Sequence, residues 1–288
     1  MNEFVKRKID VIFNIGEGEK GEKPGENIRV SGLRVAARVE YYNAAVQAEA
    51  HLRIYGLKQS LMNYLTGTGF NATEIRNNTV VIQAGNEGGI MSTVYQGNIW
   101  RSYADYSGTP DVSLNVHCLA SCYDAVKPYP SRSYKGTVDV AAILSEIARD
   151  LNLGFVNDGV NAKLTDQHLT GTAIEQIRQC AQAADISYVI QYGELVIYPK
   201  NKSREGPPVV LVTKQTGMVG YPAVSSRDIS VTTLFNPSLA VGKRAFIQSE
   251  MMVANGEWAI VGITHALESE IPGGAWFSHI QCMRVAEK

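Results

Sequence analysis

Residues 216–248 carry the pattern of a small antiparallel β unit. The glycines and proline of residues 217–222 predict a turn, and the β-branched run 229–234 predicts a strand. Asn236-Pro237 ends that strand, because proline has no backbone N–H for a sheet and restricts the residue before it. A glycine turn then leads into a last strand at residues 245–248. No residue here suggests catalysis, so the segment is interpreted as architecture.

The first 122 residues predict a series of short strands separated by turns. Along residues 28–42, apolar side chains alternate with Arg34, Arg38 and Glu40, as in a strand with one buried face. Further strands are expected at residues 7–15, 52–57, 79–85, 94–103 and 112–118, with a short helix at 58–65. Many short strands favour a small barrel or sandwich.

Residues 16–27 (GEGEKGEKPGEN) are charged, punctuated by glycine and without an apolar anchor. This composition predicts a mobile hairpin tip. The tip is either a solvated loop or an arm that becomes ordered only against a partner. The candidate contact residues of such an arm are Glu17, Glu19, Lys20, Glu22, Lys23 and Glu26.

The pattern changes to helices in the middle of the chain. Apolar residues at helical spacing predict a helix from Thr137 to about Asn152. Thr172 and Glu175 have the spacing of a capping box, which predicts the start of a second helix. A β-hairpin is expected at residues 186–199, followed by the polar, proline-ending linker NKSREGPP.

Matching spacings suggest an internal repeat. Tyr42-Asn43 is followed ten residues later by Leu52, and Phe235-Asn236 is followed at the same distance by Ala245. We therefore expect a mainly β chain in which two antiparallel β-barrels of one design flank a small two-helix α+β domain. The expected boundaries are a first barrel at 1–122, the α+β domain at 123–200, a linker at 201–208 and a second barrel at 209–288.

Composition excludes some classes of protein. Apolar residues make up 45% of the chain, and 27 Lys and Arg against 28 Asp and Glu leave a net charge of −1. Nothing in this balance favours nucleic-acid binding. The N-terminus lacks a signal-peptide core, and no apolar run approaches the roughly 18 residues of a membrane span. We expect synthesis in the cytoplasm and four buried thiols, at Cys118, Cys122, Cys180 and Cys282.

The sequence predicts no catalytic, cofactor-binding or metal-binding residues. The five histidines are scattered, and His117 and Cys118 point to opposite faces of the expected strand. No serine-hydrolase, P-loop or dinucleotide-binding motif is present. Asp105 and Asp111 have the residue type of a glycosidase pair, but charged residues in a solvated loop explain them better. An enzyme is therefore not expected.

Three segments of the chain resemble the baseplate hub proteins of contractile, Mu-like phage tails. These are GMVGYP, TLFNPSLAVGKRAFIQS and GEWAIVGITHALESEIPGGAWFSHIQC, and residues 95–118 (YQGNIWRSYADYSGTPDVSLNVHC) resemble the family's first barrel. The features shared with the family are the glycine-proline motif at 217–222, Asn236-Pro237, Gly242, His265 and Trp276. The two-helix segment fits the middle of the family's pattern.

The resemblance implies tail-tube-like barrels and a homotrimer. Six barrels would surround the DNA channel and join a threefold central spike to a sixfold tail tube, without recognising the DNA sequence. The implied partners are the tube, spike and other baseplate proteins, and the location is the virion tail. Alternatives left open are a tail-associated module that binds carbohydrate or cell wall, and a tail-associated hydrolase.

Overall fold

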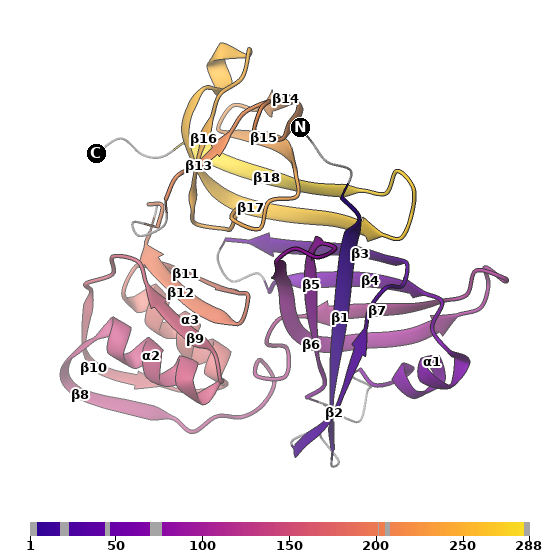
Figure 1. The fold of residues 1–288 in the computed structure, drawn as a ribbon. Helices are drawn as coiled ribbons and strands as arrows, with labels where there is room; N and C mark the ends of the chain where they lie inside the picture. The colour runs from indigo at the N-terminus through magenta and orange to yellow at the C-terminus, as the bar shows by residue number, and fades with distance from the viewer. Residues whose placement is uncertain are drawn as a thin grey trace. The chain divides into compact units, whose positions relative to one another are not determined.

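The computed structural model describes residues 5–17, 23–43, 47–69, 77–200, 202–204 and 208–284 (Figure 1). Of these residues 53% lie in strands and 12% in helices, which confirms the prediction of a mainly β chain with an α+β insert. The chain forms two compact units. The first comprises Met1–Glu40, Ala48–Tyr123 and His265–Phe277, and the second comprises Tyr41–Gln47, Asp124–Thr264 and Ser278–Lys288.

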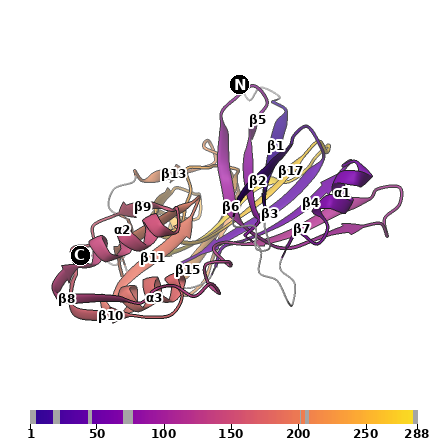
Figure 2. The same cartoon turned by 90° about the horizontal axis from the view of Figure 1, so that it is seen from below.

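Antiparallel strands in the order β3-β4-β7-β6-β5-β1-β2 make up most of the first unit. They are β1 (Arg7–Glu17), β2 (Lys23–Val30), β3 (Val35–Tyr42), β4 (Glu49–Tyr55), β5 (Thr79–Asn86), β6 (Met91–Asp105) and β7 (Ser113–Leu119). Figure 2 shows β3, β4 and β7 side by side. The expected short helix is α1 (Gln59–Leu65).

The alternation predicted for β3 is confirmed. Val35 and Val39 are buried, whereas Arg34 and Arg38 are exposed. The single strand predicted for residues 28–42 is wrong, however. The chain breaks after β2 because Gly32 adopts a φ of +69°, a left-handed conformation that glycine reaches without strain.

The hairpin at residues 16–27 has longer strands than its composition predicts. Glu17 ends β1, and Lys23 already begins β2, so much of the expected loop is paired main chain. Pro24 is tolerated because β2 pairs only with β1 and lies at the end of the strand order. Glu19, Lys20 and Glu22 lie outside the described residues.

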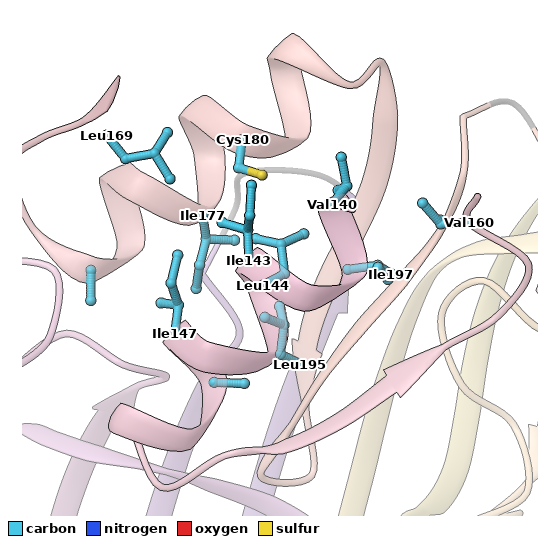
Figure 3. Packing of buried hydrophobic residues seen from close by; sticks show 12 residues of the cluster. Val140, Ile143, Leu144, Ile147, Val160, Leu169, Ile177, Cys180, Leu195 and Ile197 are labelled. Atoms are coloured by element: carbon cyan, nitrogen blue, oxygen red, sulfur yellow. The ribbon is translucent and has the colours of Figure 1, made fainter. Parts of the chain in front are cut away.

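The α+β part of the second unit packs two helices against short strands. Its elements are β8 (Arg132–Asp139), α2 (Val140–Asp150), β9 (Gly154–Asn157), β10 (Lys163–Leu169), α3 (Ala173–Ala183), β11 (Ile186–Gln191) and β12 (Glu194–Pro199). Figure 3 shows side chains of α2, including Ile143 and Ile147, pointing toward Ile177 of α3 and Leu195 of β12. These four side chains are fully buried and form the core of this part.

The two predicted helix starts have different outcomes. Thr172 caps α3 as expected, because its hydroxyl accepts a hydrogen bond from Glu175 N while the Glu175 carboxylate accepts one from Thr172 N. Thr137 is not a cap. It lies in β8 opposite Thr165, and α2 begins only after Asp139, since the strand continues to that residue.

The C-terminal strands pair in two series, β14-β15-β18-β17 and β13-β16-β17. They are β13 (Val210–Val212), β14 (Met218–Val224), β15 (Asp228–Leu234), β16 (Arg244–Ile247), β17 (Gly256–Ser269) and β18 (Trp276–Arg284), with a 3-10 turn η1 (Met252–Ala254). The turn predicted at residues 217–222 is instead the bulged strand β14, whose register shifts between Val219 and Ala223. The bulge accommodates Gly220 at a φ of +69°.

The two β-rich ends of the chain do not share one strand order. β3 pairs directly with β4, whereas the matching strands β15 and β16 are separated by β18 and β17. Within the described residues the strand pairings do not close into a ring. No helix in the described part of the chain has the length and apolar character that crossing a bilayer requires.

Candidate functional site

Polar side chains form a continuous row across four neighbouring strands of the first unit. The register places Arg38 of β3 beside His51 of β4, His51 beside His117 of β7, and His117 beside Arg101 of β6. The flanking residues Leu52 and Val116 are buried, which puts the row on the outer face of the strands.

A groove of about 570 Å³ lies along this face. Its walls include Arg34 just before β3, three strand residues (Arg53, Tyr103 and Asn115), and Glu268 from the His265–Phe277 segment of the same unit. We refer to it as the polar groove.

Neighbouring side chains contact the guanidinium groups in and beside the polar groove. Arg34 lies 4.4 Å from the ring centroid of Tyr55, and Arg101 lies 4.8 Å from that of Tyr103. Such cation–π contacts stabilise an exposed guanidinium by about 0.5–1 kcal/mol. Arg53 donates from Nε to Asn115 Oδ1 at 3.1 Å.

Two imidazoles and one carboxylate lie close together on this outer face. The rings of His51 and His117 stack with centroids 4.2 Å apart and an angle of 13° between their planes. Glu49 Oε1 lies 3.6 Å from His51 Nε2, and Glu49 Oε2 lies 3.5 Å from His117 Nε2. Burial lowers the pKa of His117, and the neighbouring His51 lowers it further, while Glu49 opposes the shift.

The family of the chain follows from its sequence. Residues 8–272 match the family model described as baseplate hub gp41. The chain belongs to this family. Among curated proteins, no sequence match was found.

Solved phage tail proteins share the fold of this hub protein. The tail protein from Neisseria meningitidis MC58 has a TM-score of 0.63 at 10% identity, over 96% of both chains. The 43 kDa tail protein of prophage MuSo2 from Shewanella oneidensis gives 0.60 at 11% identity, again over 96% of both chains. The E. coli c3393 protein gives 0.60 at 9% identity over 88% of this chain and 74% of its own. That protein is described as a type VI secretion component similar to T4 tail proteins gp27 and gp5.

The described part of the predicted contact arm consists of the paired strands β1 and β2 of the hub protein. Glu17 lies opposite Lys23, and Glu26 is exposed opposite Ile15. Asp10 is fully buried at the base of the hairpin. Burial raises the pKa of Asp10, but hydrogen bonds from Arg29 and other neighbours outweigh it and hold that pKa below its ordinary value.

The carboxylates weighed as a glycosidase pair do not form one. Asp105 accepts hydrogen bonds from the backbone N and the hydroxyl of Ser107, and these bonds lower the pKa of Asp105. Asp111 is exposed, and its backbone N donates to Gly108 O within the same loop. The four cysteines are free and buried, as predicted.

Sequence patterns missed the convergence of Glu49, His51 and His117. The predicted strand began at residue 52, whereas β4 begins at Glu49. The alternation of Glu49, His51 and Arg53 with buried neighbours was the available signal. The position of His117 depended on the pairing of β4 with β7, which no local pattern specifies.

Proposed function

We propose that this baseplate hub protein assembles as a homotrimer in which each chain contributes two β-rich ends, so that six such ends surround a central channel. The ring joins a threefold central spike to a sixfold tail tube. Family membership over residues 8–272 is the observation that carries the proposal. The fold shared with phage tail proteins also supports it.

Strand edges supply surfaces for such an assembly. Among the described pairings, β2 pairs only with β1, and β14 only with β15. An edge strand offers unpaired N–H and C=O groups to another chain. β14 also exposes Val219, Tyr221 and Val224 at 41%, 65% and 43%, and exposed apolar residues of this kind favour packing against a partner.

The proposal extends to partners and location. The protein is made in the host cytoplasm and joins the virion tail, where it contacts tube, spike and other baseplate proteins. DNA passes through the ring without sequence recognition, which agrees with the net charge of −1. The hairpin of β1 and β2 contacts a neighbouring baseplate subunit.

The oligomeric state tests the proposal in solution. Light scattering on the purified protein, alone and with its spike, should give about three times the chain mass of 31.4 kDa for the hub component. A monomer or dimer under both conditions would contradict the trimer. A peptidoglycan-release assay should show no activity, since the family is a structural one.

A further inference from the structure

Three side chains with metal-binding chemistry meet on the outer face of the first unit. Glu49 and His51 lie two residues apart on β4, and therefore on one side of that strand. His117 lies directly opposite His51 on β7. One donor atom from each residue lies within 4.8 Å of the other two.

The spacing between the Glu49 carboxylate and each imidazole is compatible with shared coordination. Imidazole nitrogens and carboxylate oxygens bind zinc at about 2.0–2.2 Å, so two ligands of one ion lie about 3–3.5 Å apart. Glu49 Oε1 lies 3.6 Å from His51 Nε2, and Glu49 Oε2 lies 3.5 Å from His117 Nε2. The two rings are stacked, so they rotate about their side-chain bonds when both nitrogens face one ion. Good hydrogen bonds between such atoms are about 2.7–3.2 Å long.

Charges of both signs surround the three side chains. Glu40 lies opposite Glu49 in the register of β3 and β4, which adds a second carboxylate beside the cluster. Arg38, beside His51, is paired with Glu40, whereas Arg101, beside His117, stacks on Tyr103 and keeps its positive charge. Glu49 is therefore the carboxylate whose charge a bound cation would neutralise.

We propose that Glu49, His51 and His117 bind a divalent cation of the zinc class. Two imidazoles and one carboxylate are a donor set that zinc accepts, with the remaining position open to water. The three side chains are 37%, 51% and 29% exposed, although His117 Nε2 itself is buried and has no hydrogen-bond partner among the residues that the structure describes. The bound ion links β4 to β7 and thereby stabilises the wall of the polar groove.

Calorimetric titration of Zn²⁺ into the full chain tests the site. The protein carries no polyhistidine tag and is first treated with a chelator. Wild type should bind one ion per chain at this site. E49Q, H51Q and H117Q should each weaken binding at least about tenfold, because losing even an outer-shell partner weakens metal affinity about 10- to 100-fold.

The control is H168Q. His168 is exposed on β10, and its Nδ1 lies 2.8 Å from Ser133 Oγ. None of its contacts in the described part of the chain is a carboxylate. This variant should bind Zn²⁺ like wild type. Thermal unfolding in chelator checks that all four variants are folded, and added Zn²⁺ should raise the melting temperature of wild type and H168Q only. Equal Zn²⁺ affinity and equal stabilisation across folded variants, or no binding by wild type, would overturn the proposal.

Discussion

The guanidinium of Arg204 binds the carboxylate of Asp158 inside the second unit, and only 9% of either side chain is exposed. Arg204 N also donates to Gly242 O at 2.8 Å, and Asp158 N donates to Ile197 O at 2.9 Å. The pair therefore connects the strand β12 to the turn before β16. Arg204 lies in a segment whose polar composition predicted a linker, yet this residue is buried.

Replacing Arg204→Ala should destabilise the second unit strongly. The Asp158 carboxylate would remain buried without its partner, and breaking a buried pair costs about 3–5 kcal/mol. Urea unfolding measures the loss. Arg227→Ala, at an exposed turn, is the matched control and should change the free energy of unfolding by less than about 0.5 kcal/mol. Equal effects of the two variants would show that the pair adds no stability.

The contribution of the capping box to the stability of α3 should be measurable separately. Thr172→Ala removes the hydroxyl that accepts from Glu175 N at 3.2 Å, and loss of such a cap costs about 1 kcal/mol. Hydrogen exchange of the first-turn amides of α3 should accelerate accordingly. Ser145→Ala at a half-buried position of α2 is the control, and its helix should exchange as in wild type. Unchanged exchange in the Thr172 variant would contradict the role of the cap.

Stability should fall as pH rises from about 4 to about 6 because of Asp124. Burial raises the pKa of this carboxyl from 3.8 to about 6, despite the opposing charge of Lys127. Between these values the folded state holds a proton that the unfolded state has released, so raising the pH favours unfolding. The full effect is about 3 kcal/mol.

Asp124→Asn isolates this contribution, because it removes the titrating group and leaves other groups in place. Urea unfolding of both proteins at several pH values between 4 and 7 gives the comparison. The wild type should lose stability relative to the variant across this range. A constant difference between the two proteins would show that the Asp124 pKa is not raised in the folded state.

Neutralising the hairpin tip tests the proposed contact arm. The combined changes Glu19→Gln, Lys20→Gln and Glu22→Gln should impair particle assembly while the trimer stays folded, because charged side chains at the tip are proposed to meet a neighbouring subunit. Glu87→Gln, in the exposed turn between β5 and β6, is the control and should assemble normally. Normal particle yield from the triple variant would contradict the arm.

Sequence patterns predicted those elements whose signal lies within the element itself. Val35 and Val39 alternate with exposed arginines, and Thr172 with Glu175 is a complete local signal, so both were foreseen. Strand ends were less predictable where outward residues are polar, as at Glu49. Pairing partners were not predictable at all, since His51 and His117 are 66 positions apart in the sequence (117 − 51) and meet only because β4 pairs with β7.

The central proposal is that three chains place six β-rich ends around one channel. A low-resolution electron-microscopy map of the assembled hub ring tests it most directly. The map should show threefold symmetry, with six β-rich densities of similar size alternating around the axis. A ring with only three such densities at the channel, the other ends lying away from the axis, would contradict it.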